Sequence, residues 1–198
     1  MLDIQGTRSF HGHMCPGLAI GIRAAEIALR EIGPHSADEE IVAVVETDMC
    51  GVDAIQYLTG CTFGKGNLIH LDYGKSAFTF IRRSDGKALR IVMRPDAWGE
   101  RDPEHTRLFA RVRSGEATSA ERARFETLHQ DRAQQVLDLP EAVLFEVVPV
   151  EARIPEPARI HRSLACATCG EIAMETRTRN YGGEVLCLPC FEAAVRRV

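Results

Sequence analysis

Histidine and cysteine side chains recur at alternate positions near the start of the chain. His11, His13 and Cys15 are each two residues apart, in a run that ends at Pro16 and Gly17. In an extended segment these side chains would face one common region, because side-chain direction repeats every second residue. Neutral imidazole and thiolate are ligands that zinc and related transition metals prefer. The spacing therefore predicts a metal-binding edge, and the alternative is a surface histidine pair beside a structural cysteine.

A second group of cysteines stands near the other end of the sequence. Cys166 and Cys169 form one Cys-x-x-Cys pair, and Cys187 and Cys190 form another after a gap of 17 residues. This spacing is typical of a zinc site in which each pair supplies two thiolates to one tetrahedral ion. A segment of this size buries too little apolar surface to fold unaided, so we expect structural zinc to stabilise it. Because protein ligands fill all four positions, this zinc offers no open site for catalysis.

Two patches between these groups carry further candidate residues. Cys50 stands where a β-branched run over 41–47 gives way to a short helical pattern, and Asp53 follows it. Functional groups often gather where a strand of a sheet gives way to a helix. Lys65 lies in a glycine-rich loop over 60–67, whose amide groups and ammonium could hold a carboxylate or phosphate. The alternatives are a core position for Cys50 and a turn with a solvated lysine for Lys65.

The pattern of apolar residues predicts a mixed fold that must position these groups. Apolar side chains three and four residues apart predict a helix over 16–32, and β-branched content predicts a buried strand over 41–47. The other elements that we expect are a short helix over 52–59, strands over 68–72, 77–82 and 88–93, helices over 103–113 and 119–137, and a strand over 143–150. This order lacks regular βαβ alternation, so it predicts an α+β domain with a mixed or antiparallel sheet packed with helices.

The chain divides into a larger and a smaller part. Its 198 residues suffice for one good-sized domain plus a small appendage. Two prolines within 154–157 give that stretch the character of a stiff, extended linker. We therefore expect a core domain over 1–153, a linker over 154–164 and a zinc-binding module over 165–198.

Charge and hydropathy exclude several classes of protein. A formal net charge of −4 argues against non-specific nucleic-acid binding. No apolar run approaches the ~20 residues that span a bilayer, and the first residues lack the pattern of a signal peptide. We therefore expect a cytoplasmic protein without a membrane or nucleic-acid partner. In the absence of an export signal, the seven cysteines favour metal binding or thiol chemistry over disulfides.

Four ordered motifs resemble a known family. They are His-Gly-His-Met-Cys-Pro-Gly at 11–17, Asp-Met-Cys-Gly-Val-Asp-Ala-Ile-Gln at 48–56, Thr-Gly-Cys-Thr-Phe-Gly-Lys-Gly-Asn at 59–67 and Asp-Tyr-Gly-Lys at 72–75. Over most of the first 150 residues, the chain resembles the FmdE-like proteins, a family named after one subunit of formylmethanofuran dehydrogenase. The C-terminal module is similar to zinc fingers of the DksA/TraR type. The resemblance implies an α+β core, commonly a homodimer, with a metal-capable Cys/His site and a zinc-finger tail.

The first hypothesis for function is a core site that holds zinc or another transition metal and binds or transforms a small anionic ligand. The candidate core ligands are His11, His13, Cys15 and Cys50. The candidate catalytic residues are Cys50, Asp53 and Lys65. Lys65 would neutralise the charge of the ligand, and Asp53 would orient a ligand histidine or act as a base. Three protein ligands plus a water would suit an enzyme and four a structural site, so the sequence leaves catalysis open.

The second hypothesis is an accessory or maturation subunit of a molybdenum or tungsten oxidoreductase, which the resemblance implies. Its zinc finger would dock onto a subunit of that enzyme. A third hypothesis, regulation of transcription through the finger, ranks last because the long coiled coil expected beside such a finger is missing.

Overall fold

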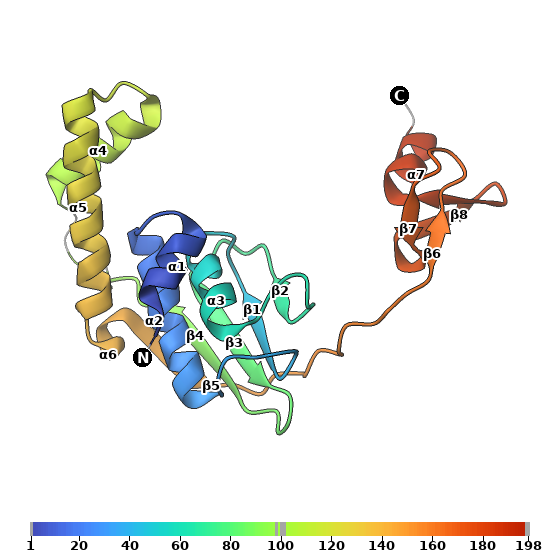
Figure 1. Cartoon of the computed structure of the whole chain (residues 1–198), viewed down its shortest axis with the longest axis horizontal. Coiled ribbons are helices and arrows are strands. Elements are labelled where there is room, and N and C mark those ends of the chain that lie inside the picture. The colour runs from blue at the N-terminus through green and yellow to red at the C-terminus, as the bar shows by residue number, and fades with distance from the viewer. Residues whose placement is uncertain (1, 98, 100–101, 197–198) are drawn as a thin grey trace. The chain divides into compact units, whose positions relative to one another are not determined.

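The computed structural model describes residues 2–97, 99 and 102–196 (Figure 1). The described chain forms two compact units, Met1–Pro157 and Ala158–Val198. A search of the described residues finds no helix with the length and apolar character needed to cross a membrane.

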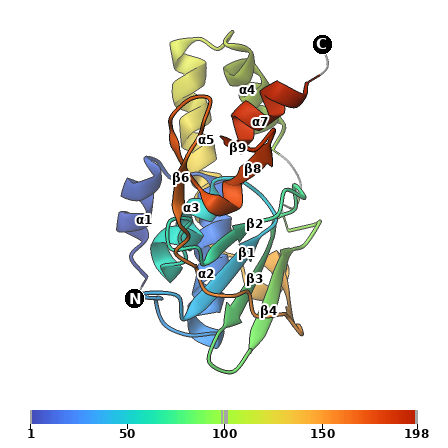
Figure 2. The same ribbon diagram turned by 90° about the vertical axis from the view of Figure 1, so that its right-hand side faces the viewer.

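The first unit is built on one mixed sheet. In the described chain this sheet has five strands in the order β2-β1-β3-β4-β5 (Figure 2). In that order the strands are Leu68–His70, Ile41–Val45, Ala77–Arg82, Ala88–Met93 and Phe145–Pro149. β1 and β2 are parallel, and the other neighbouring pairs are antiparallel. The sheet confirms the predicted α+β class.

Helices cover the sheet and extend beyond it. The helices of this unit are α1 (Ile4–His11), α2 (Pro16–Glu31), α3 (Gly51–Thr59), α4 (Pro103–Ser114), α5 (Ser119–Asp138) and α6 (Glu141–Leu144). The sequence predicts α2, α3, α4 and α5 to within a few residues, whereas α6 replaces the start of the strand expected over 143–150. The buried faces of α2 and α3 pack with β1 and β3 in one apolar core, and Figure 1 shows both helices on the same side of the sheet.

The sequence does not predict α1, because this helix has almost no apolar face. Thr7 is the residue of α1 that is buried. Asp3 caps the helix by accepting the Gly6 N–H at 2.8 Å, and it also accepts the Tyr57 hydroxyl of α3 at 2.7 Å. The helix is therefore held by a cap and by a contact with a residue far away in the sequence, neither of which produces a periodic pattern.

The backbones of α2 and α3 touch each other. A Cβ atom added to Gly21 of α2 would lie 2.1 Å from the carbonyl oxygen of Gly51 in α3. One turn earlier, a Cβ on Gly17 would lie 3.3 Å from the Cβ of Cys50. Since backbone atoms cannot move aside as a flexible side chain can, position 21 admits no residue larger than glycine at this helix spacing. The contact brings the first turns of the two helices together.

The second unit is small and rich in turns. Its elements are β6 (Ser163–Ala165), β7 (Ile172–Met174), a 3₁₀ turn (Glu175–Arg177), β8 (Thr178–Tyr181), β9 (Glu184–Cys187) and α7 (Leu188–Val195). β6 pairs with β7 and β8 with β9, both antiparallel. Its buried core consists of Cys166, Leu186 and Cys187, with partly buried residues packed against them. So few apolar side chains cannot fold a unit of this size by themselves.

We expect Gly21→Ala to lower the free energy of unfolding by about 1–3 kcal/mol, because the new methyl group forces α2 and α3 apart. Denaturation in urea, followed by far-UV circular dichroism, measures the loss. Gly64→Ala is the matched control, since a Cβ at Gly64 meets no atom within 4 Å. Equal midpoints for the two variants would contradict the role of the helix contact.

Candidate metal centres

A chain reversal between α1 and α2 carries the first candidate residues. His11 is the last residue of α1, and Gly12 follows in the left-handed conformation with φ of 96°. Cys15 is extended and caps α2, where its Sγ accepts the Leu18 N–H at 3.4 Å. The predicted extended segment from His11 to Cys15 is therefore wrong, because a helix end and a left-handed glycine occupy its first half.

The reversal brings His11 and Cys15 together with Cys50. One ligand atom from each of these residues lies within 4.8 Å of the other two. His11 Nε2 is 3.9 Å from Cys15 Sγ, whereas an imidazole nitrogen and a thiolate on one tetrahedral zinc ion are about 3.6 Å apart. A small contraction would thus let the three atoms share one ion. We call these three residues the core cluster.

Asp53 orients the histidine of the core cluster. Its Oδ2 lies 2.6 Å from His11 Nδ1. If Nδ1 donates its proton to this carboxylate, Nε2 is left with a free lone pair on the side of Cys15. A histidine that binds a metal usually donates its other N–H to such a partner, which fixes the tautomer and the ring orientation. Asp53 is thus placed to position His11.

His13 lies beside the core cluster and does not belong to it. Its side chain is exposed, and its ring stacks against that of His11 with the centroids 4.6 Å apart. The group of mutually close ligand atoms contains His11 in place of His13. Alternate spacing therefore does not lead both histidines to the same point, because the intervening Gly12 turns the chain.

The protein surroundings of Cys15 disfavour an isolated thiolate. The residue is buried, and burial raises the pKa of its thiol to about 11, with the neighbouring Cys50 sulfur acting in the same direction. The Leu18 N–H opposes this rise only in part. A thiolate here needs a cation beside it, and transition-metal ions supply such a charge.

Lys65 does not lie with the core cluster. Its Nζ donates hydrogen bonds to the Ser36 and Ala37 carbonyl oxygens, at 2.9 and 3.4 Å. Nearby, the Asn67 amide donates to the Ile41 carbonyl at 2.9 Å, and the buried Cys61 thiol faces the same oxygen. The glycine-rich loop is therefore tied to the segment before β1, and its lysine is occupied by backbone carbonyls.

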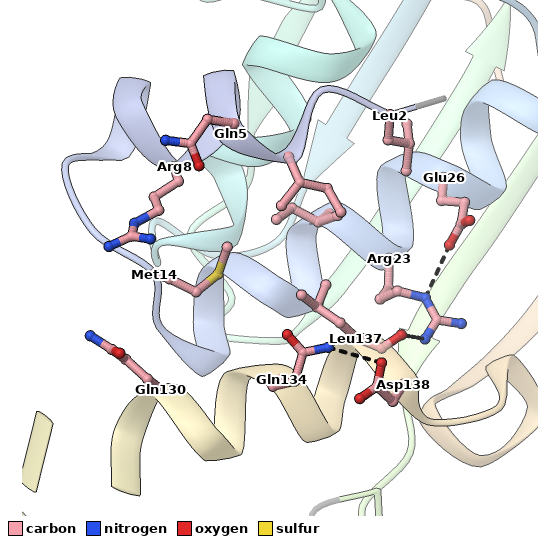
Figure 3. A pocket seen from close by; sticks show the side chains of 12 residues that line it. Leu2, Gln5, Arg8, Met14, Arg23, Glu26, Gln130, Gln134, Leu137 and Asp138 are labelled. Carbon is pink, nitrogen blue, oxygen red and sulfur yellow. Dashed lines mark hydrogen bonds and ion pairs between the residues drawn. The ribbon is translucent and has the colours of Figure 1, made fainter. Parts of the chain in front are cut away.

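A cavity of about 470 Å³ lies among α1, α2 and α5 (Figure 3). The apolar part of its lining comes from Leu2, Ile4, Met14, Ile22 and Leu137. Among its polar groups, Arg23 is bound to Glu26 and Gln134 to Asp138. Within the described residues, the Arg8 guanidinium has no hydrogen bond or ion pair. Because Met14 stands between His13 and Cys15, the cavity reaches the chain segment that carries the core cluster.

The four C-terminal cysteines converge as zinc ligands do. Their sulfur atoms all lie within 4.8 Å of one another, and the Sγ atoms of Cys169 and Cys187 are 3.9 Å apart. Two thiolates on one tetrahedral zinc ion are about 3.8 Å apart. Backbone amides at Cys169 and Cys187 lower the pKa of Cys166 to about 6, while the crowded sulfurs raise the pKa of Cys190 to about 12. A central cation removes this conflict, so the donor set fits zinc.

Comparison with known proteins matches both units to families. Residues 10–146 match the family described as FmdE, molybdenum formylmethanofuran dehydrogenase operon. Residues 159–196 match the prokaryotic dksA/traR C4-type zinc finger. Together with the sulfur geometry, this match identifies the C-terminal unit as a zinc finger that holds a structural zinc ion.

Two individual proteins are similar to this chain. A probable S-adenosyl-L-methionine-binding protein of Archaeoglobus fulgidus is 36% identical over 192 residues, which cover 92% of this chain and 50% of that protein. The chain thus spans about half the length of this relative. The crystal structure of a tungsten formylmethanofuran dehydrogenase FmdE-like protein from Syntrophus aciditrophicus has a TM-score of 0.64 at 23% identity, covering 98% of this chain and 92% of that one. This likeness shows a shared fold.

We expect Cys169→Ser to reduce the zinc content by about one ion per chain and to unfold the finger, because the remaining three thiolates hold the metal poorly. Elemental analysis and two-dimensional NMR of the full chain measure both effects. Cys61→Ala serves as the control, since Cys61 is a buried core thiol. Retention of zinc and of the finger resonances in Cys169→Ser would contradict the assignment.

Proposed function

This chain belongs to the FmdE family, and from that premise we propose that its core domain binds a transition-metal ion at His11, Cys15 and Cys50. The bound ion would serve to bind or transform a small anionic molecule. The observation that carries the proposal is the convergence of three ligand atoms within 4.8 Å, with Asp53 hydrogen-bonded to the histidine. Both features are absent from the sequence pattern and arise from the packing of α1, α2 and α3.

The donor set favours particular metals and a particular kind of site. One imidazole and two thiolates suit zinc and softer transition metals, whereas magnesium and calcium prefer oxygen ligands. Three protein ligands are also the set found in catalytic zinc sites, whose fourth position takes water or substrate. In such a site Asp53 holds the His11 tautomer, and the Leu18 N–H supports the Cys15 thiolate.

The cavity among α1, α2 and α5 supplies a place for the anionic molecule. Its volume of about 470 Å³ is that of a small-molecule site. Arg8 and His11 are three residues apart on α1, so they are neighbours on the surface of that helix. A carboxylate or phosphate at Arg8 would leave the rest of the molecule against the apolar lining. We therefore give Arg8 the charge-neutralising role that the sequence assigns to Lys65.

We expect the full chain to bind about one metal ion beyond the zinc of the finger, and His11→Gln or Cys15→Ala to lose that ion. Asp53→Asn should weaken binding about 10- to 100-fold, because the histidine loses the partner that orients it. Equilibrium dialysis with elemental analysis measures the stoichiometry and the affinity.

His70→Gln is the control for these variants, because His70 is an exposed histidine on β2. A chain that holds only the zinc of the finger would exclude the core metal site. Full metal retention in Cys15→Ala would exclude this ligand set.

We expect Arg8→Gln to weaken binding of an amphipathic anion about tenfold or more, the effect of losing one charge-assisted hydrogen bond. The probe is 8-anilinonaphthalene-1-sulfonate, whose fluorescence rises in an apolar site. S-adenosyl-L-methionine, the ligand in the name of the Archaeoglobus relative, is the first competitor to test. Lys65→Gln is the control, and equal losses in both variants would contradict a specific role for Arg8.

A docking role of the zinc finger is the second candidate function. Ile172 and Met174 lie two residues apart on β7 and are 67% and 54% exposed, so two large apolar side chains share one face. We propose that this face contacts a subunit of a molybdenum or tungsten oxidoreductase, an enzyme class that the family description suggests. Co-purification with such a subunit, lost in Met174→Asp while zinc is retained, would support it. Co-purification that is indifferent to Met174→Asp would exclude this face.

A further inference from the structure

Two histidines on the α4–α5 hairpin form a pair outside the core cluster and the finger. His105 stands in the first turn of α4, and His129 stands in the second half of α5. Nε2 of His105 lies 3.0 Å from Nδ1 of His129. The two ring planes are 10° apart, and both side chains are half-buried. Two imidazole nitrogens from different helices thus face each other at short range.

Aromatic side chains hold the pair in this arrangement. The Phe125 ring lies 5.3 Å from the His105 ring and 4.8 Å from the His129 ring, measured between centroids. Phe109 also stacks with His105, with its centroid 6.3 Å away. Rings packed in this way lose little further freedom when a ligand binds, and such preorganisation favours binding.

The separation of the two nitrogens is that of ligands on one metal ion. With metal–nitrogen bonds of about 2.05 Å, two imidazoles are about 3.3 Å apart at a tetrahedral angle and about 2.9 Å apart at a right angle. The observed 3.0 Å is close to the right-angle value. Square-planar and octahedral ions, such as Cu²⁺ and Ni²⁺, have neighbouring ligands at right angles. The geometry therefore suits these ions better than tetrahedral zinc.

Binding at the pair needs no net loss of protons. The rings now share one hydrogen bond, in which one of the facing nitrogens carries the proton. A metal ion takes the place of that proton, which moves to the outer nitrogen of the same ring. His105 then carries its proton on Nδ1 and His129 on Nε2, so both rings stay neutral.

The charged and titratable groups around the pair include a further ligand. His13, from the α1–α2 loop, is near enough to His129 to act on its charge, after burial and His105 itself. Asp102 and Arg132 act on His105 in opposite directions. His13 is exposed, so its side chain is free to turn toward the pair.

We propose that His105 and His129 form a second metal site, for a divalent ion with right-angle coordination such as Ni²⁺ or Cu²⁺, with His13 as the third ligand. This site gives His13 a role that the core cluster does not give it. Because the His13 ring also stacks on His11, the new site adjoins the core cluster without sharing a ligand with it. The inference does not depend on whether the core cluster binds metal.

Ni²⁺ is the probe that tests this site, added to the full chain with its finger already loaded with zinc. Equilibrium dialysis should show one Ni²⁺ that is lost in His105→Gln and in His129→Gln, and that binds more weakly in His13→Gln. His70→Gln and Cys15→Ala are the controls and should keep it. Because Ni²⁺ is paramagnetic, NMR signals of α4 and α5 in the wild-type protein should broaden on its addition.

The outcomes separate this site from the core cluster and from a folding defect. Equal Ni²⁺ uptake in wild type and His129→Gln, or loss of the ion in Cys15→Ala, would overturn the proposal. Broadening that spares α4 and α5 in the wild type would overturn it without any variant. Tighter binding of Zn²⁺ than of Ni²⁺ at the pair would overturn the right-angle geometry.

Discussion

The backbone contact between α2 and α3 is the constraint on which the core cluster depends. Cys15 caps α2, and Cys50 directly precedes α3, so each sulfur occupies a fixed position relative to its helix. The two sulfurs can approach only if the first turns of the helices do. Gly21 and Gly51 allow this approach because neither carries a side chain. Two residues with no chemistry of their own thereby determine where the chemistry takes place.

The same helix α3 also holds α1 at both of its ends. Tyr57 donates to Asp3 before the start of α1, and Asp53 binds His11 at its end. Asp53 and Tyr57 are four residues apart, so they lie on one face of α3. Asp53 consequently serves two purposes, since it fastens α1 to the core and sets the tautomer of the histidine that faces Cys15. A short polar helix with little apolar surface can be kept in place by such paired contacts.

Residues of the same type have separate roles in this protein. Cys61 is a core thiol, the four C-terminal cysteines hold zinc, and Cys15 with Cys50 forms a second thiol pair beside a histidine. Burial and hydrogen-bond partners make the difference, because they decide whether a thiolate is stabilised. Lys65 is a similar case, since two carbonyl oxygens occupy the ammonium that the sequence assigns to a ligand.

The sequence by itself determined the α+β class, most helices and strands, the family and the zinc finger. These depend on local periodicity or on ligands at short, fixed spacing, as in the two Cys-x-x-Cys pairs, and chain geometry then leaves little choice. Only the tertiary structure decided that His11 in place of His13 joins Cys15, that Asp53 supports it from 42 residues away, and that Lys65 stands apart. A helix without an apolar face and a left-handed glycine redirect the side chains there. Such contacts between distant segments are set by packing, which no spacing along the chain records.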